Sequence, residues 1–382
     1  MDIMESPLTT LVPRARPDFN DRPFIVIWEV TQACDLACVH CRACAQPLRS
    51  QFELSTAEAK RLLDEIREMQ APIFVFTGGD PLKRHDIYDL VEYARGIGLR
   101  PSISPSATPL LTREAIAELK RRGMVRLAIS LDGSTPALHD AFRGVAGTYA
   151  RAIDAIRQAR ELGVTVQVNT TVTPRNFDDL DALAQLLETL DIALWSAFFL
   201  VPTGRAQSSD LVSAEQFEQV FGKLYEISCR SSFDVKTTEA MHFRRYVAQR
   251  RAAARRQTGT APSPHLRATI PDGIGRGPLG ISDAKGFVFV SHVGEVYPSG
   301  FLPLSAGNVR RQSLDEIYRR SHLFVSLRDT SNLKGKCGVC EFREICGGSR
   351  SRAYAVTGCP FASEPCCAYQ PKAAAKMASS LA

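Results

Sequence analysis

The sequence predicts an α/β protein: a partial (β/α)6 barrel of the TIM type, followed by a smaller α+β domain rich in cysteine. Short β-branched or aromatic runs alternate with amphipathic stretches between residues 24 and 228. Polar motifs follow these runs, and cysteines gather near both ends of the chain. Alternating β and α segments imply parallel strands joined by right-handed crossovers, hence an α/β sheet or barrel.

Six strands are expected in the barrel. In chain order they are the runs FIVIWEV, IFVF, LRPSI, VRLAISL, VTVQVNTTV and ALWSAFFL. Six units would leave the barrel partly open, and the chemistry of such folds lies in loops after the strand ends.

Helical patterns, with apolar residues three and four apart, alternate with these strands. They cover residues 55–69, 86–97, 112–122, 148–162, 176–190 and 213–228. Ser55 with Glu58 and Ser213 with Gln216 match the capping box that starts a helix.

Unusual polar motifs follow the strands and are therefore expected on one rim of the barrel. They are a cysteine loop, residues 77–80 (TGGD), Ser104, Asp132 with Gly133, Asn169, and residues 202–204 (PTG).

We divide the chain into five parts. They are an N-terminal arm (1–22), the barrel (23–239), a linker or loosely ordered insertion (240–280), the second domain (281–370) and a tail (371–382). The second domain is expected to begin with a hairpin that turns at Gly294, and to continue through a short helix capped by Ser313.

Composition favours an ordinary globular protein of 382 residues, 45% of them hydrophobic, with a net charge of +6. The arginines between positions 244 and 256 are interpreted as a solvated helix face or loop rather than a nucleic-acid site. No signal peptide or membrane span is recognised, which predicts a cytoplasmic location. In that reducing compartment, eleven cysteines indicate metal binding rather than disulfides.

The first cysteine motif is C-x3-C-x2-C, formed by Cys34, Cys38 and Cys41. Three thiolates can hold three irons of a 4Fe-4S cube, and the fourth iron can then bind a small molecule. Cys44 follows closely and could complete a four-thiolate electron-transfer cluster instead. We rank Cys44 as a bystander, since small buried cysteines are common and inert.

The loop CDLACVHC, the GGD after the second strand and the six units together resemble the radical S-adenosylmethionine (SAM) superfamily. The resemblance implies a 4Fe-4S cluster held by Cys34, Cys38 and Cys41, whose open iron binds SAM. It also implies reductive cleavage of SAM to methionine and a 5'-deoxyadenosyl radical, which abstracts a substrate hydrogen. The protein then orients the reactants and excludes water.

The resemblance also implies the SAM contacts. Gly78, Gly79 and Asp80 would bind the amino group, where the family usually has Glu in place of Asp80. Arg143 would meet the carboxylate with its fork of donors. The remaining contacts would come from Ser104, Ser130, Asp132 and Asn169. His40, inside the cysteine loop, is expected to pack on the cluster.

The second cysteine motif reads C-x2-C-x5-C at Cys337, Cys340 and Cys346, with Cys366 and Cys367 twenty residues later. It resembles the SPASM domain, which carries auxiliary iron-sulfur clusters. Two of the ligands expected for the first auxiliary cluster are serines here, Ser299 and Ser349.

These losses leave ligands for one auxiliary 4Fe-4S cluster, with Cys367 preferred over Cys366 as the fourth. A zinc ribbon is the alternative for this segment.

The C-terminal segment is most similar to radical SAM members that trim tetrapyrrole side chains, including haem synthase and haem d1 maturation types. This similarity implies oxidative modification or decarboxylation of a tetrapyrrole side chain, with an electron donor such as flavodoxin or ferredoxin. Maturation of a ribosomally made peptide is the alternative activity, and an iron-sulfur electron carrier or zinc-binding protein is the non-enzymatic one. No nucleic-acid or membrane partner is expected, and no catalytic residue can be assigned.

Overall fold

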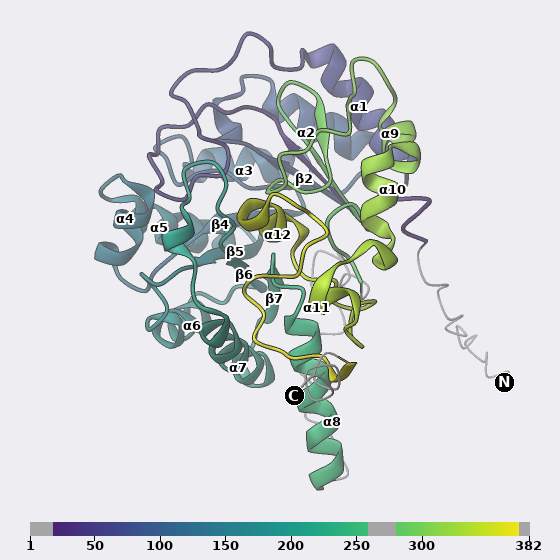
Figure 1. Cartoon of the computed structure of the whole chain (residues 1–382). Coiled ribbons are helices and arrows are strands. Elements are labelled where there is room, and N and C mark those ends of the chain that lie inside the picture. Colours follow the sequence, from purple (N-terminus) through teal and green to yellow (C-terminus); the bar gives the residue numbers. More distant parts are fainter. Residues whose placement is uncertain (1–17, 259–279, 374–382) are drawn as a thin grey trace, which may run out of the picture.

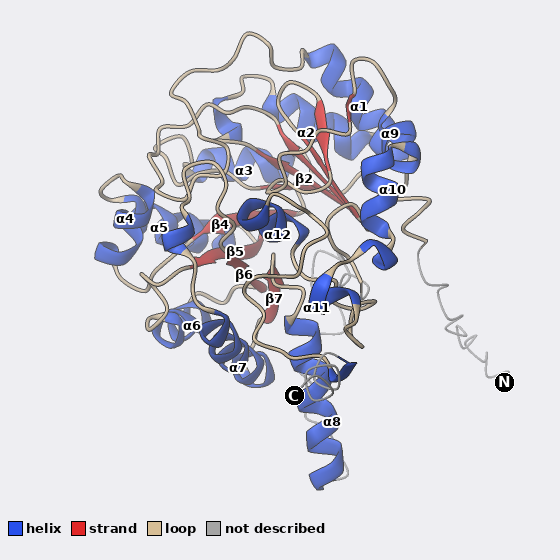
Figure 2. Ribbon diagram, in the orientation of Figure 1, coloured by secondary structure: helices blue, strands red, loops and turns tan. Residues whose placement is uncertain are grey.

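The computed structural model describes residues 18–258 and 280–373. Within them a single ten-stranded sheet runs in the order β10-β9-β8-β1-β2-β3-β4-β5-β6-β7. Strands β1 to β7 follow one another in parallel, each joined to the next through helix on the same side (Figure 2). This confirms the α/β class and the partial barrel.

The six expected strands are all present. They are β1 (Ile25–Glu29), β2 (Ile73–Thr77), β3 (Pro101–Ile103), β4 (Arg126–Ser130), β5 (Thr165–Val172) and β6 (Leu194–Phe199). Along β1 and β2 the side chains facing the helices are fully buried aromatic or aliphatic groups, including Trp28 and Phe76. Burial of each large side chain contributes about 2–3 kcal/mol to folding.

The barrel contains one strand that we did not predict, β7 (Asp234–Thr238), which pairs in parallel with β6. Its sequence, DVKTT, has a single large apolar residue, Val235, which packs against the core. A strand at the end of the parallel series needs only one such contact, so its hydrophobic pattern was too weak to detect.

The expected hairpin forms as β8 (Phe287–Val290) and β9 (Glu295–Tyr297), and β10 (Gly307–Asn308) adds to it. Strand β8 also pairs in parallel with β1. The sheet therefore continues from the barrel into residues that follow position 280.

Six helices cover the outside of the barrel as expected. They are α1 (Thr56–Glu68), α2 (Ile87–Gly96), α3 (Arg113–Arg121), α5 (Thr148–Glu161), α6 (Leu180–Thr189) and α7 (Ala214–Arg230). In Figure 1 they form an arc around the strands. Both expected capping boxes are present, at Ser55 and Ser213.

Shorter helices complete the loops. They are α4 (Pro136–Arg143), between β4 and α5, and the 3-10 turns η1 (Pro81–Lys83), η2 (Ser208–Asp210) and η3 (Thr330–Asn332).

Residues 243–258, which we placed in a linker or loosely ordered insertion, instead form helix α8 (Phe243–Thr258). The rest of that expected segment, 259–279, lies outside the described residues. We did not assign this helix from the sequence because the many arginines of α8 hide its apolar period. Phe243 and Tyr246 nevertheless pack against the core. Figure 1 shows α8 projecting from the body of the protein.

The C-terminal helices lie over the barrel. They are α9 (Leu314–Arg320), α10 (His322–Arg328), α11 (Gly335–Gly338) and α12 (Arg350–Thr357). Ser313 caps α9 as expected. Helix α12 lies inside the arc of outer helices (Figure 1) and is fixed there by Arg352, which donates to the carbonyls of Phe199 and Leu200 at the end of β6.

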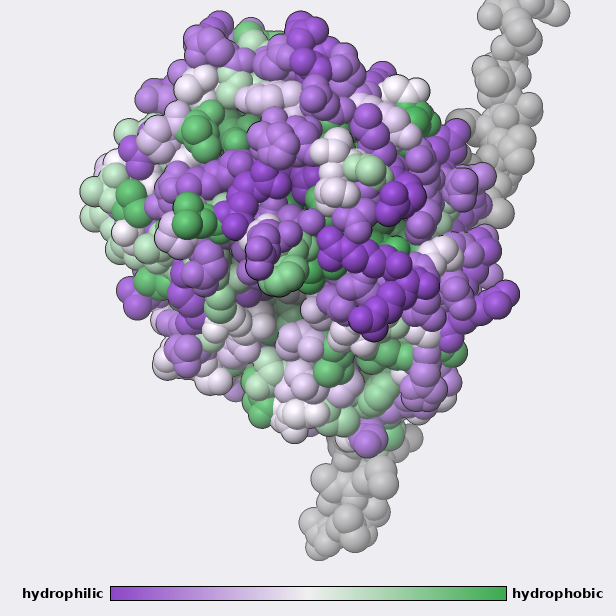
Figure 3. Space-filling model, turned by 90° about the horizontal axis from the view of Figure 1, so that it is seen from above, coloured by the Kyte–Doolittle hydropathy of each residue, from purple (hydrophilic) through white to green (hydrophobic). Residues whose placement is uncertain are grey.

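No helix among residues 18–258 and 280–373 is long and apolar enough to span a bilayer. The face seen in Figure 3 carries hydrophobic residues in scattered patches between hydrophilic ones, rather than in one belt.

Candidate metal centres and cofactor site

Three of the four N-terminal cysteines pack together. Cys34 and Cys38 are buried with Leu36, and Cys41 packs against this small cluster. Cys44 is exposed instead, in a left-handed conformation with φ of 48°. The loop therefore groups three thiols and turns the fourth outward.

The glycines that follow β2 pack closely against the start of the cysteine loop. A Cβ atom on Gly78 would lie 2.6 Å from the carbonyl oxygen of Thr31, and one on Gly79 would lie 2.5 Å from that of Gln32. The Asp80 amide donates to the carbonyl of Ala33 at 2.7 Å. Only residues without a side chain allow this close approach of two backbones.

The carboxylate of Asp80 is engaged by the protein itself. It is fully buried and accepts hydrogen bonds from the Thr108 hydroxyl (2.7 Å), the Leu82 amide (3.1 Å) and the Ser106 amide (3.4 Å). Ser106 in turn accepts a hydrogen bond from the Cys34 thiol at 3.4 Å. Asp80 thus fixes the segment that contacts the first cysteine.

The loop after β6 holds the cysteine loop from the other side. Arg205 donates from Nε to the carbonyl of Cys38 at 2.8 Å, and its amide donates to the carbonyl of Cys41 at 3.0 Å. Gly204 has φ of 64°, and a Cβ atom there would lie 2.3 Å from the Cys41 carbonyl oxygen. The PTG motif was recognised in the sequence, whereas Arg205 was not singled out.

Arg143, at the end of α4, points at the same loop. One guanidinium nitrogen lies 3.7 Å from the Cys38 sulfur, and another pairs with Asp132. Burial alone would raise the pKa of Asp132, but the charge of Arg143 outweighs it, so the pKa falls below its usual value. The ionised pair therefore anchors the guanidinium beside Cys38.

The other predicted contacts stand at the same rim or just below it. Ser104 follows β3, and its amide donates to the carbonyl of Phe76 at 2.9 Å. Ser130 and Asn169 are direct neighbours on β4 and β5 and are partly exposed. His40 is half-buried and packs edge-on against Phe142; the surrounding protein lowers its pKa to about 4, so the ring is neutral.

Hydrogen-bond donors near the cysteine loop indicate whether an anionic group would fit there. Among the described residues, Nε of Arg143 and one terminal nitrogen of Arg205 are buried without a hydrogen-bond partner. A buried guanidinium N–H left unsatisfied costs free energy, and anionic groups are its strongest partners. Thiolate-bound iron and a carboxylate both suit this donor set.

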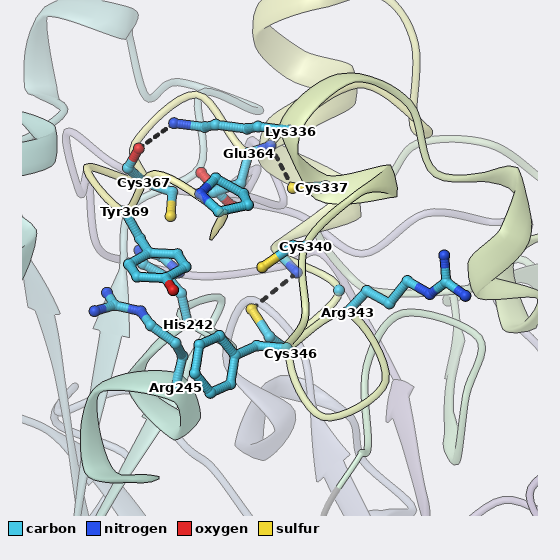
Figure 4. A pocket seen from close by; sticks show the side chains of 14 residues that line it. His242, Arg245, Lys336, Cys337, Cys340, Arg343, Cys346, Glu364, Cys367 and Tyr369 are labelled. Atoms are coloured by element: carbon cyan, nitrogen blue, oxygen red, sulfur yellow. Dashed lines mark hydrogen bonds between the residues drawn. The ribbon is translucent and has the colours of Figure 1, made fainter. Parts of the chain in front are cut away.

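The C-terminal cysteines line a pocket that encloses about 400 Å³, part of it open to solvent. Figure 4 shows the sulfurs of Cys337, Cys340, Cys346 and Cys367 turned toward a common space. Backbone amides of Glu364 and Gly348 donate to the sulfurs of Cys337 (3.3 Å) and Cys346 (3.4 Å). Cys366 and Cys367 lie in different surroundings. Cys367 lines the pocket, whereas Cys366 is buried in the main hydrophobic core.

Basic and aromatic side chains surround this pocket (Figure 4). Arg245 of α8 lines it and pairs with Glu218, and Lys336 donates to the carbonyl of Cys367. Burial raises the pKa of Cys346 to about 12. Deprotonation of such a thiol requires a strong positive charge nearby, such as bound metal.

The spread of the thiols distinguishes the possible metals. Within residues 18–258 and 280–373, no three cysteine, histidine or acidic side chains approach closely enough to hold a single metal ion. Four thiols around one zinc ion would do so, whereas each thiol of a cube binds a different iron. The four thiols that line one pocket are compatible with a cube.

Ser299 and Ser349, which stand where the SPASM resemblance implies cluster cysteines, meet at one buried carboxylate. Their hydroxyls donate to the two oxygens of Glu239, at 3.0 and 2.5 Å. Burial and the charge of Asp283 raise the pKa of Glu239 to about 8. A hydrogen-bonded network thus fills the space between β7 and α12. Only the two serines signalled it in the sequence, and Glu239 was missed.

Comparison with known proteins agrees with this arrangement. Residues 28–187 match the radical SAM superfamily. The chain is 40% identical to the AdoMet-dependent heme synthase of Oleidesulfovibrio alaskensis, over 94% of this chain and 91% of that protein. It is 29% identical to the PqqA peptide cyclase of Rhodopseudomonas palustris, over 91% and 88%. The crystal structure of Streptococcus suis SuiB bound to S-adenosylmethionine superposes with a TM-score of 0.69 at 15% identity, covering 91% of this chain and 78% of that one.

Proposed function

Because the chain belongs to the radical SAM superfamily, we propose that this enzyme oxidatively decarboxylates propionate side chains of an iron-containing tetrapyrrole. In this reaction a propionate loses one hydrogen atom, carbon dioxide and one electron, and becomes a vinyl group. The similarity to a heme synthase over 94% of the chain carries the proposal.

The 4Fe-4S cluster and SAM of this superfamily supply the electron and the 5'-deoxyadenosyl group that takes up the hydrogen atom. In our proposal Cys34, Cys38 and Cys41 hold that cluster. The packing of these three thiols in one cluster, with Cys44 turned outward, supports this assignment.

We propose that SAM lies on the rim between the cysteine loop and the ends of β2 to β5. Arg143 and Arg205 would offer their unpaired N–H groups to its carboxylate or to the thiolates. Gly78 and Gly79 would present backbone atoms, while Asp80 and Asp132 would act by fixing the loops around it. The remaining contacts would come from Ser104, Ser130 and Asn169.

For the electron released by the substrate, we propose a second cluster held by Cys337, Cys340, Cys346 and Cys367. The pocket that these thiols line supports it. A flavodoxin or ferredoxin would supply the first electron. No feature of the described residues favours the peptide-modifying alternative over the tetrapyrrole.

Anaerobic turnover tests the proposal. The reconstituted enzyme, dithionite, SAM and iron-coproporphyrin should yield 5'-deoxyadenosine and porphyrin products that have each lost carbon dioxide and two hydrogen atoms per side chain. The protein should carry about eight irons and little zinc. Formation of 5'-deoxyadenosine with an unchanged porphyrin, and with a modified peptide from a neighbouring gene, would replace the tetrapyrrole by the peptide.

A further inference from the structure

The inner face of the sheet carries polar side chains, in contrast to the apolar face that packs on the helices. A row of direct neighbours crosses four strands: Ser130, Asn169, Ser196 and Lys236. The last residue of this row, Lys236, lies on β7, the strand that we did not predict. There Val235 packs against the hydrophobic core, so Lys236, the next residue, faces the opposite side.

Lys236 lies on the inner face of the sheet and is exposed to solvent. The residue keeps exposed surface, whereas its neighbour Ser196 is fully buried. At the same time, burial and then the charge of Arg126 lower the pKa of Lys236 to about 8. Arg126 lies on β4, on the same face as Ser130, so the two cations approach each other inside the barrel.

Among the described residues, no acidic side chain forms an ion pair with Lys236. Arg42 of the cysteine loop is different, because it pairs with Glu29 at 2.6 Å. A lysine on the inner face of the sheet that is open to solvent, stands beside another cation and forms no ion pair is available to an anionic ligand. Such a charge is typical of a binding site for an anion.

Aromatic side chains stand on strands at both ends of the barrel sheet. Phe198, two residues above Ser196 on β6, lies 6.4 Å from Phe301 between ring centres. Phe289 of β8 lies 6.3 Å from Tyr297. Aromatic faces at the rim can support a planar macrocycle, while a cation deeper in the barrel can meet a carboxylate on its edge.

We propose that Lys236 is a binding residue for a substrate carboxylate, one that lies deeper in the barrel than the reacting side chain. This inference rests on the proposed function, since it assigns Lys236 to a propionate of the tetrapyrrole. Lys236 stands two residues before the end of β7, roughly 7 Å below the rim. It would therefore orient the macrocycle so that another propionate reaches the cysteine loop.

Binding of iron-coproporphyrin, followed by visible absorbance under argon, tests this inference. Lys236→Met should weaken binding roughly 10- to 100-fold, because it removes one charge-assisted pair. Lys236→Arg should retain most of the affinity. Lys223→Met is the matched control: Lys223 pairs with Asp181 on the outer helices and should not affect binding.

Two further measurements separate the possible outcomes. Iron-coproporphyrin with esterified carboxyl groups should bind the wild type and Lys236→Met equally weakly. The melting temperature of Lys236→Met should be equal to or above that of the wild type, which excludes misfolding. Equal affinity of wild type and Lys236→Met for the free acid would overturn the assignment of Lys236 alone. A wild type that binds no porphyrin would overturn both the assignment and the proposed function.

Discussion

The two cysteine sites of this enzyme are built in opposite ways. The N-terminal loop brings three thiols together, and segments after β2, β4 and β6 hold it from several sides. The C-terminal site takes its four thiols from one short stretch, residues 337–367, and adds side chains from α8. One site depends on the whole barrel, the other mainly on local sequence.

The cations beside the two sites can be compared as well. Beside the N-terminal thiols, Arg143 and Arg205 keep buried N–H groups without a partner among the described residues. Beside the C-terminal thiols, Arg245 pairs with Glu218 and Lys336 donates to the carbonyl of Cys367, while Nε of Arg245 is likewise buried without a partner in the described part of the chain. Both sites therefore keep a donor for an anionic group, and they differ in the number of grouped thiols, three in the first and four in the second.

The largest expected effect comes from the N-terminal thiols. Cys38→Ala should reduce 5'-deoxyadenosine formation by at least about 1,000-fold, because the open cluster cannot form with two thiolates. Cys44→Ala is the control and should retain wild-type rates. Chromatography of the reaction mixture measures both. A Cys44 variant as inactive as Cys38→Ala would mean that the site is closed by four thiolates.

The C-terminal site should respond differently. Cys346→Ala should lower the iron content by about half and abolish the porphyrin product, while 5'-deoxyadenosine still forms. Cys366→Ala should change the iron content little, because Cys366 lies in the hydrophobic core. Iron analysis with product mass spectrometry distinguishes them. Full iron content in Cys346→Ala would refute the assigned ligand set.

Removing an unpaired donor should have a smaller effect. Arg205→Met should weaken SAM binding roughly tenfold, since one charge-assisted hydrogen bond is worth about 1.5 kcal/mol. Arg160→Met, which breaks an exposed pair with Asp191, should leave SAM binding unchanged. Equilibrium dialysis with labelled SAM measures this difference. Equal losses in the two variants would point to a general charge effect.

The smallest effect concerns the hydrogen-bonded network of Ser299, Ser349 and Glu239. The pKa of Glu239 is raised to about 8, so the folded protein holds that proton after the unfolded chain has lost it near pH 4.5. Stability should therefore fall as pH rises between these values. Between pH 6 and 8 the melting temperature should drop by roughly 2–4 °C in the wild type and less in Glu239→Gln. If the melting temperatures of the wild type and Glu239→Gln changed equally with pH, the raised pKa of Glu239 would be contradicted.

Much of this architecture could be predicted from the sequence. Strong hydrophobic patterns revealed β1 to β6 and their helices, and cysteine spacing identified both thiol sites. Weak patterns hid β7 and α8, which contribute Lys236 and Arg245. Long-range contacts could not be predicted from the sequence either. Strand β8 pairs with β1, and Arg205 contacts Cys38, although these residues are far apart in the chain. Such contacts depend on tertiary packing rather than local preference.

Electron paramagnetic resonance of the reduced enzyme tests the contrast between an open and a complete site most directly. Two variants isolate the sites: one with Cys34, Cys38 and Cys41 changed to alanine, the other with Cys337, Cys340 and Cys346 changed. Added SAM should alter the spectrum of the second variant, which keeps the N-terminal site, and leave that of the first untouched. A spectrum that responds to SAM only in the first variant would contradict the account.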